Sequence, residues 1–597
     1  MRYLIFFVLL FINLAVLAQN EQLARNYVEQ GEYAKAKAIY EKLYKKQKFN
    51  TTYFMGLVNA HQQLEEYKEV ESLLLEKIKQ SPQFPNTYIE LGHNYELQDK
   101  ITEANTYYQE ALALIDQNPN SAYIIGSTFQ KYNKLDEAIT AYEKGMSLNP
   151  KSNFDIQLAR LYGEQGNIEK MFNSYLDLVN KNPQYMITAN RNIEQFISED
   201  PYNDGNVILK TLLLKRLQQD PKVLYNEMLS WLFIQQKEYK KAFLQEKAVY
   251  LRTQETLEGI IDVALIAIED NDNDAARDIL SYIVEEARLP ETKLRAHELK
   301  LGLDIKNATP KHWDDIEDEF SSLFQAYGKS IETMSLQIAY ANFLAFKKEQ
   351  TASAISTLKN LLDQDKNRFQ EATIKMALAD ILVLDEKFNQ ALIYYSQIQN
   401  IVKNNTLSQE ARFKVAKTSY YKGDFSWSET QLDVLKASAS QLIANDAMEL
   451  SLLIKDNSLE DSTQTALKKF AKADLLTFKG KNEAAIAVLE EILIQHKGEK
   501  IEDEALLRQA NLFIEAKEFE KAEANYKKII TFYPTDILGD DAYYGLAKLY
   551  DEHLARPEDA KANYEKVIFD YADSIFYVDA RKRYRTLRGD AINETTL

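Results

Sequence analysis

The chain has 597 residues, too many for one hydrophobic core, so it must form several domains or one linear array of small packing units. Only 17 glycines and 11 prolines occur, and this scarcity favours long helical runs over strands and turns. A net charge of -18 argues against nucleic-acid binding, and the absence of cysteine excludes disulfides, thiolate metal sites, thiol catalysis and a cysteine-linked lipid anchor.

The first residues have the pattern of a secretory signal. Arg2 supplies positive charge, residues 3–14 form an almost unbroken apolar run, and Ala18 is a small residue at a cleavage site before Gln19. An uncleaved N-terminal anchor is the alternative interpretation. No later segment reaches the ~20 apolar residues of a membrane-spanning helix. We therefore predict a signal peptide at residues 1–18 and an exported chain, periplasmic or secreted, that is not lipid-anchored.

A repeat of thirty-four residues follows this segment. Residues 88–111 match residues 122–145 position by position. The matching pairs are Leu91 and Ile125, Gly92 and Gly126, Tyr95 and Phe129, Ala104 and Ala138, Tyr108 and Tyr142, and Ala111 and Gly145. The register extends upstream to Ala24 and downstream to Pro183. Such self-similarity is the signature of a repeat array, and residues 19–183 are predicted to hold about five units.

Each unit has the composition of two amphipathic helices joined by a polar turn. Small residues such as Gly92 and Ala104 allow the two helices to cross closely, while Tyr95 and Tyr108 fill the space between neighbouring pairs. Prolines such as Pro150 end the second helix of a pair. A single pair cannot bury its apolar face, so the pairs must stack.

These positions resemble the tetratricopeptide repeat family. The third and fourth units meet the family's Leu-Gly, Tyr, Ala, aromatic, Ala and Pro positions, although Tyr88 and Ala122 stand where the family has an early tryptophan. The resemblance implies an all-α fold, a right-handed superhelical solenoid of antiparallel helix pairs. It also implies a non-catalytic scaffold whose partner is a protein or peptide.

The middle of the chain keeps the repeat less regularly. Pro201, Pro290 and Pro310 interrupt the helical pattern, and the repeat positions are only partly met. We predict a degenerate helical region at residues 184–330 and degenerate repeats at residues 331–500.

The repeat sharpens again at residues 501–590, which we expect to end in a capping helix. Two similar linkers stand out there, Tyr533-Pro534-Thr535-Asp536 and Tyr571-Ala572-Asp573-Ser574. Their arrangement resembles the envelope subfamily of these repeats, found in the lipoprotein that assists outer-membrane barrel assembly and in the Tol-Pal-associated periplasmic protein. The assembly lipoprotein needs an anchoring cysteine, which this chain lacks. The resemblance implies a role in a bacterial cell envelope.

No motif for catalysis or cofactor binding appears. The six histidines never fall three or four residues apart, and no phosphate-binding glycine loop or Gly-x-Ser-x-Gly motif occurs. We therefore predict no catalytic residue, no cofactor, no metal and no enzyme activity. The alternative is an enzyme or carbohydrate-binding protein with a site in the irregular segments 184–222 or 289–330. His312 and Trp313, followed by two aspartates, form the one notable cluster there.

A candidate binding surface follows from the family resemblance, in which the first helices line a concave groove for extended peptides. The residues that fall on it are mostly polar, namely Asn59, Gln63, Asn86, His93, Asn120, Tyr123, Ser127, Asn153 and Arg160. Asparagine side chains can bond a peptide backbone without demanding a sequence, which suits an extended ligand. The alternative is that these polar residues keep the groove solvated. No lysine pair accompanies Arg160, so a clamp for a terminal carboxylate is not expected.

The strongly basic stretch lies at the end of the predicted final helix and comprises Arg581, Lys582, Arg583, Arg585 and Arg588. Cations at a helix C-terminus interact favourably with the helix dipole, by ~0.3 to 1 kcal/mol each when exposed, which gives them a capping role. The alternative is docking to an acidic partner or a membrane surface.

Overall fold

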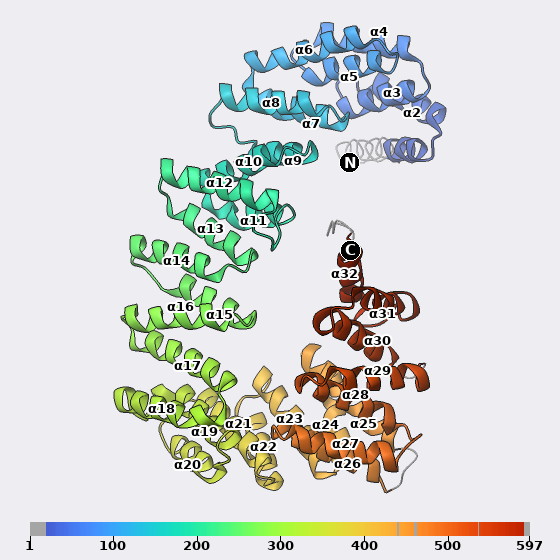
Figure 1. Cartoon of the computed structure of the whole chain (residues 1–597). Helices are drawn as coiled ribbons and strands as arrows, with labels where there is room; N and C mark the ends of the chain where they lie inside the picture. The colour runs from blue at the N-terminus through green and yellow to red at the C-terminus, as the bar shows by residue number, and fades with distance from the viewer. Residues whose placement is uncertain (1–18, 439–440, 459–462, 535–536, 590–597) are drawn as a thin grey trace, which may run out of the picture. The chain divides into compact units, whose positions relative to one another are not determined.

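The computed structural model describes residues 19–438, 441–458, 463–534 and 537–589, and every regular element among them is helical. Contacts divide the chain into two compact units, unit 1 (Met1–Thr253) and unit 2 (Gln254–Leu597). In both units successive helices run back and forth and pack side by side as pairs (Figure 1). The predicted all-α solenoid of helix pairs is confirmed. The predicted signal peptide lies outside the described residues.

Unit 1 starts with helical residues 19–29. Its further elements are α2 (Tyr33–Lys46), α3 (Thr51–Gln63), α4 (Tyr67–Gln80), α5 (Pro85–Glu96), α6 (Ile101–Gln117), η1 (Pro119–Ser121), α7 (Ala122–Lys131), α8 (Leu135–Leu148), α9 (Asp155–Glu164), α10 (Ile168–Lys181), η2 (Pro183–Tyr185), α11 (Met186–Glu194), α12 (Asp204–Gln219), α13 (Val223–Gln235) and α14 (Tyr239–Thr253).

The regular repeats of unit 1 form two layers of helices. The first helix α5 packs against the next first helix α7, and the second helix α6 packs against the next second helix α8. Figure 1 shows α4, α6 and α8 on one side of these repeats. The apolar residues lie between the layers, where Tyr108, Tyr142 and Phe129 are at most 2% exposed. The tyrosines at repeat positions are therefore packing residues, as the sequence predicted.

In most pairs the turn between the two helices contains one residue in the left-handed conformation. In unit 1 these residues are Gly31, Glu65, Asp99, Asn133, Gly166 and Lys237. The first four lie thirty-four residues apart, which is the period read from the sequence. In unit 2 the same kind of turn recurs at Asn271, Glu349, Glu386, Gly423, Gly480, Lys517 and Ala555. The turns of the pairs α11–α12 and α17–α18 contain no such residue, so the repeat geometry is interrupted at these two pairs and resumes after each of them.

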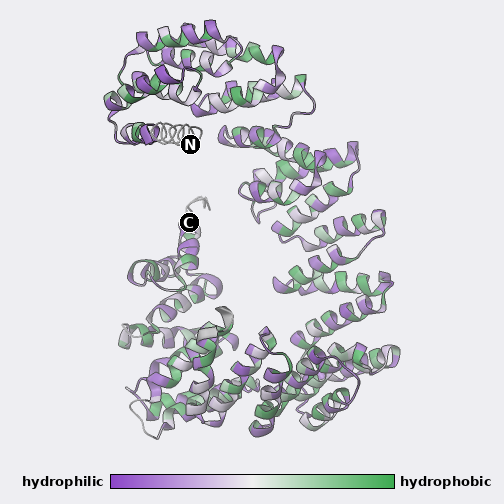
Figure 2. Cartoon of the chain, turned by 180° about the vertical axis from the view of Figure 1, so that it is seen from behind, coloured by the Kyte–Doolittle hydropathy of each residue, from purple (hydrophilic) through white to green (hydrophobic). Residues whose placement is uncertain are grey.

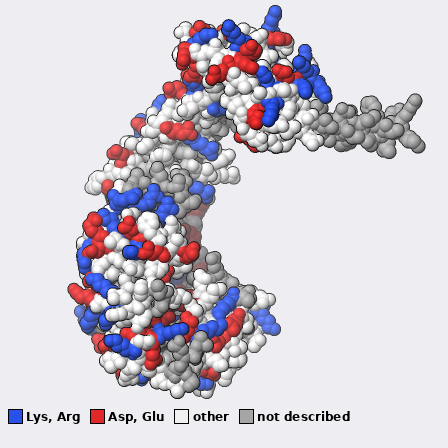
Figure 3. All heavy atoms as spheres, turned by 90° about the vertical axis from the view of Figure 1, so that its right-hand side faces the viewer, with Lys and Arg blue, Asp and Glu red and all other residues white. Residues whose placement is uncertain are grey.

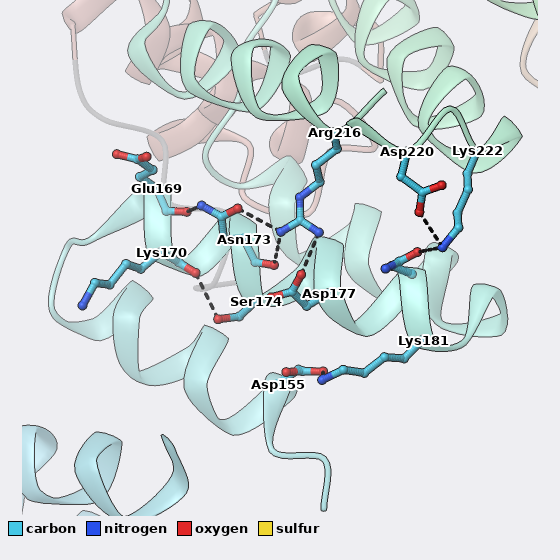
Figure 4. Close-up of polar contacts among 11 residues, drawn as sticks. Asp155, Glu169, Lys170, Asn173, Ser174, Asp177, Lys181, Arg216, Asp220 and Lys222 are labelled. Atoms are coloured by element: carbon cyan, nitrogen blue, oxygen red, sulfur yellow. Dashed lines mark hydrogen bonds and ion pairs between the residues drawn. The ribbon is translucent and has the colours of Figure 1, made fainter. Parts of the chain in front are cut away.

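Residues 184–222 continue the helical array through α11 and α12. Arg216 of α12 reaches α10, where Nη1 lies 2.7 Å from Asp177 Oδ1 and Nη2 lies 2.9 Å from Asn173 Oδ1 (Figure 4). Lys222, just after α12, donates to Asn180 at 2.6 Å. These cross-helix bonds attach the segment to the preceding repeat.

Unit 2 is a second run of helix pairs with one extra helix. Its elements are α15 (Glu258–Glu269), α16 (Asn273–Glu286), α17 (Pro290–Asn307), η3 (Pro310–His312), α18 (Trp313–Tyr327), η4 (Ile331–Thr333), α19 (Met334–Phe346), α20 (Thr351–Leu362), α21 (Arg368–Leu384), α22 (Phe388–Ile401), α23 (Thr406–Lys422), α24 (Phe425–Ser438), α25 (Gln441–Ser458), α26 (Thr465–Phe478), α27 (Asn482–Gln495), α28 (Ile501–Glu515), α29 (Phe519–Phe532), α30 (Gly539–Lys548), η5 (Leu549–His553), α31 (Pro557–Asp570) and α32 (Tyr577–Arg588). The extra helix is α25, which contacts α23, α24 and α26.

The surface of the helices is polar and of mixed charge. Figure 2 shows hydrophilic and hydrophobic residues alternating along the helices, as amphipathic packing requires. Figure 3 shows acidic and basic side chains interspersed over the face in view. Among the described residues, no helix combines the length and the apolar character needed to cross a bilayer.

Candidate binding surface

The nine predicted binding residues lie on or beside the first helices of unit 1. Asn59 and Gln63 belong to α3, Asn86 and His93 to α5, and the others follow along η1, α7 and α9. We call these nine residues the first-helix surface. Gln63 and Arg160 are exposed at its two ends, and Asn59 is half-buried.

Tyr123 is the large side chain of this surface. It is 53% exposed, whereas Tyr142 in the same repeat is fully buried. Its ring stacks beside Phe154, with the ring centroids 6.3 Å apart. An exposed aromatic ring held by a buried neighbour offers apolar contact area at little cost in side-chain entropy.

Three polar atoms of α5 are buried without a hydrogen-bond partner. Two of them belong to predicted binding residues, namely Asn86 Oδ1 and His93 Nδ1, and the third is Asn94 Oδ1. The His93 ring stacks on Tyr132 with a centroid distance of 3.9 Å. Burial lowers the pKa of His93, although the charges of Glu90 and Glu96 oppose the shift, so the ring is neutral near pH 7. Unpaired buried polar atoms are rare in folded proteins, and the side chains of Asn86 and His93 are only half-buried as a whole.

A buried carboxylate that the sequence analysis missed lies between these two residues. Glu90 is 2% exposed, and it accepts hydrogen bonds from Lys131 Nζ at 3.0 Å and from the Tyr132 hydroxyl at 2.5 Å. Burial and the Glu90 charge raise the pKa of Tyr132. A signal was present, because Glu90 follows Asn86 by four residues and precedes His93 by three, which places all three on one helix face.

Three of the predicted residues already use their polar atoms within the fold. Asn120 Oδ1 accepts a bond from Asn149 at 3.2 Å, and Asn153 Oδ1 accepts one from the backbone N–H of Asp155 at 3.0 Å. The Ser127 hydroxyl donates to the carbonyl of Ile124 in its own helix. One polar atom of each side chain is therefore occupied within the fold, and binding of a peptide backbone by these three residues stays a prediction. Asn120 and Asn153 stabilise the turns that precede first helices.

The irregular segments do not bring their polar residues together into a site. At the start of α18, Trp313 packs against a hydrophobic cluster, His312 contacts Thr309, and Asp314 pairs with Lys348 at 3.0 Å. Within the described ranges, no group of three or more His, Cys, Asp or Glu side chains is suited to hold a metal ion. Both segments are connecting helices, the arrangement that favours the scaffold over the enzyme alternative.

The basic stretch lies in α32, as predicted. Arg583 is tied to its neighbours, with Nε 2.7 Å from Asp579 and Nη1 2.8 Å from Glu552. The Arg588 guanidinium lies over the ring of Tyr584. At least part of this stretch therefore holds α32 in place, and an acidic partner or a membrane surface stays a prediction.

Comparison with known proteins supports the repeat. Sequence models described as Tetratricopeptide repeat match residues 22–47, 119–152, 470–537 and 541–574. No curated protein sequence matches the chain.

Two solved structures are similar over most of their length. One is described as "Structure of Naa15/Naa10 bound to HypK-THB", with 12% identity, 97% of each chain covered and a TM-score of 0.28. The other is described as "Crystal structure of APC/C hetero-tetramer Cut9-Hcn1", with 13% identity, 95% of this chain and 96% of that chain covered, and a TM-score of 0.23. Both scores are too low to support any conclusion about this chain. The four matched segments and the helix pairs themselves show that the chain contains tetratricopeptide repeats, a fold typical of protein-interaction scaffolds.

Proposed function

We propose that this chain is a non-catalytic scaffold of a bacterial cell envelope that binds an extended segment of a protein partner on the first-helix surface of unit 1. The observation that carries the proposal is the combination on this surface of an exposed Tyr123 with the unpaired atoms Asn86 Oδ1 and His93 Nδ1. The ring offers apolar area. Asn86 Oδ1 can accept a hydrogen bond, and Nδ1 of neutral His93 can donate or accept one according to its tautomer, once either half-buried side chain turns its buried atom towards the ligand. A peptide backbone provides both a donor and an acceptor.

The proposed location rests on the sequence of the first residues. Arg2 and the apolar run that follows have the pattern of an export signal, and the C-terminal linkers resemble an envelope subfamily. A chain tagged at its C-terminus should be recovered from the envelope fraction of a bacterial source, with a new N-terminus at Gln19. Recovery of the uncleaved chain from the cytoplasm would overturn the location and leave the binding surface untouched.

Site-specific crosslinking tests the surface itself. A photoreactive phenylalanine placed at Tyr123 should form an adduct with a partner in envelope extracts of the native source. The same group placed at Thr106, an exposed position on the second helix α6, serves as the matched control. Equal adducts at both positions, or none at Tyr123, would refute the surface.

A variant completes the test. The triple variant Asn86→Ala, Tyr123→Ala and Arg160→Ala should no longer capture the partner that the wild-type chain captures. It removes the unpaired oxygen of Asn86, the ring of Tyr123 and the charge of Arg160 at the end of the first-helix surface. A control variant changes three exposed residues of the second helices, Thr106→Ala, Gln109→Ala and Thr140→Ala. Loss of the partner in both variants, or in neither, would contradict the proposal.

A further inference from the structure

Unit 2 has a pocket where the extra helix α25 meets the repeat helices. Its volume is about 430 Å³, and side chains from α21, α22, α23, α25 and α26 line it. This volume falls in the range of pockets that hold small molecules, which is roughly 300 to 1,000 Å³. It lies in unit 2 alone and does not depend on the first-helix surface of unit 1.

One wall of the pocket is apolar. Phe413 of α23, Ile443 of α25 and Phe478 of α26 contribute to it, and all three are half-buried. Tyr421 packs close to Phe478, with the ring centroids 6.1 Å apart. Aromatic rings from different helices therefore face a common space that could hold another apolar group of similar size.

Two carboxylates at or near the pocket already have a cation beside them. Lys414 Nζ lies 2.8 Å from both oxygens of Asp380, which lines the pocket and also accepts a bond from Tyr395. Asp474 of α26 does not line the pocket. Its Oδ1 lies 3.2 Å from Arg508 Nε, and its Oδ2 accepts a bond from Tyr420 at 3.0 Å.

Lys417 differs from the other cations at this site. It lines the pocket from α23, and its ammonium group has neither an ion pair nor a hydrogen bond among the described residues. Its side chain reaches solvent through the pocket, yet the surrounding helices displace much of the water around it, and this desolvation lowers the pKa of Lys417. The charges of Lys414 and Arg508 act in the same direction, while Asp474 and Asp446 oppose them. An anion bound at Lys417 would be the direct partner that this ammonium group lacks among the described residues.

The rim of the pocket is acidic. Glu410 is about half-exposed and lies 4.0 Å from Lys414, and Asp446 is exposed on α25. Both carboxylates are solvated, so neither needs a cation from the ligand. They disfavour ligands with several negative charges, such as phosphates, and leave room for one negative charge at Lys417.

We propose that this pocket binds a carboxylate joined to an apolar group about the size of an aromatic side chain. The Lys417 ammonium holds the carboxylate, and the wall formed by Phe413, Ile443 and Phe478 holds the apolar group. Such a ligand is either a free organic acid or the acidic end of a polypeptide, since both offer the same chemistry.

Calorimetric titration of the full chain tests this site with 3-phenylpropanoate as the probe. We expect saturable binding of the acid, and binding of 3-phenylpropanamide, its neutral counterpart, should be at least ~10-fold weaker because it cannot form a charge-assisted bond. N-acetyl-Gly-Gly-Phe, with its free carboxylate, distinguishes the two sources. Tighter binding of this peptide than of 3-phenylpropanoate identifies a polypeptide ligand, and the reverse identifies a free acid.

Two variants make the test specific. Lys417→Met keeps the length of the side chain and removes its charge, so binding of the acid should weaken by ~10-fold or more. Lys472→Met removes an exposed charge on α26 that does not line the pocket, and should leave affinity unchanged. Melting temperatures of both variants verify that they fold. The proposal would be overturned if the acid and the amide bound with equal affinity, or if the Lys417→Met variant bound the acid as tightly as the wild type does. It would also be overturned if neither 3-phenylpropanoate nor N-acetyl-Gly-Gly-Phe bound.

Discussion

The packing of glycine against tyrosine in each regular repeat leads to a prediction about stability. A Cβ atom added at Gly126 of α7 would lie 2.5 Å from Cζ and 2.6 Å from Cε1 of Tyr142 in α8. Tyr142 is fully buried, its hydroxyl donates to Gln130 at 2.8 Å, and its ring lies 5.2 Å from that of Phe154. The ring therefore has no free space into which it can move, and Gly126→Ala must shift α7 away from α8.

The expected size of the effect follows from two opposing terms. Alanine in place of glycine within a helix stabilises the fold by ~0.5 to 1 kcal/mol. Overpacking a dense interior costs ~1 to 3 kcal/mol, so we expect a net loss of ~1 kcal/mol. For a unit of this size, that loss lowers the melting temperature by about 2 to 4 °C.

Gly302 of α17 provides the matched control. It is also a helical glycine, but nothing lies within 4 Å of an added Cβ. Gly302→Ala should therefore raise stability through helix propensity alone. Circular dichroism melts measure both changes, and hydrogen exchange localises them to α7 and α8 or to α17. The packing argument would be refuted if Gly126→Ala stabilised the chain as much as Gly302→Ala does. It would also be refuted if adding Tyr142→Leu to Gly126→Ala did not offset the loss of stability caused by Gly126→Ala.

Two further predictions concern Glu504, which is partly buried, and Asn206, which is fully buried. Burial, reinforced by the neighbouring charge of Asp503, raises the pKa of Glu504 to about 8. A carboxyl whose pKa is higher in the folded state destabilises the fold once it ionises. The stability that protonated Glu504 contributes is therefore fully present below about pH 4 and is lost as the pH rises towards 8. Between pH 5 and pH 9 the melting temperature of the Glu504→Gln variant should therefore fall less than that of the wild type. Parallel plots of melting temperature against pH for the two proteins would contradict this prediction. Asn206 is fully buried and donates to the carbonyls of Ser198 at 2.7 Å and Asp200 at 2.6 Å, so Asn206→Ala should cost unit 1 ~1 to 3 kcal/mol in urea unfolding. An unchanged urea midpoint would show that water replaces the amide.

The fold could be predicted because one physical requirement recurs at a fixed spacing. Two helices that cross closely need a small residue such as Gly92 opposite a large one such as Tyr108, and the turn between them needs a residue that tolerates positive φ, such as Asp99. These requirements act within one unit and appear directly in the sequence. In the middle of the chain residues such as Lys237 and Glu349, which carry no turn signal, adopt the same turn geometry, so the sequence pattern fades at pairs whose turns are regular. The pairs α11–α12 and α17–α18 have no left-handed turn residue, so there the structure departs from the repeat as well.

The side-chain contacts on the first-helix surface were harder to predict than the fold because asparagine serves two purposes. The same side chain that can bond a peptide also stabilises turns at helix starts, and the sequence does not distinguish Asn86, whose oxygen is unpaired, from Asn153, whose oxygen caps its own turn. The exposure of Tyr123 was predictable, since its repeat position lies on the helix face that a tetratricopeptide array turns towards its groove. Glu90 was missed because an acidic residue on a helix is usually solvated, and only the contact with Lys131 and Tyr132 shows that it is buried.

The extra helix α25 explains why the pocket of unit 2 left no signal in the repeat pattern. Left-handed turns at Gly423 and Gly480 lie fifty-seven residues apart, whereas those at Glu386 and Gly423 lie thirty-seven apart. In a solenoid each pair contacts mainly its neighbours, so one inserted helix can dock without disturbing distant units. It brings Ile443 and Asp446 to the repeat helix that carries Lys417, and these residues are unrelated to the repeat positions. A new chemical site is therefore most readily gained at such an insertion, where the demands of repeat packing on residue type are weakest.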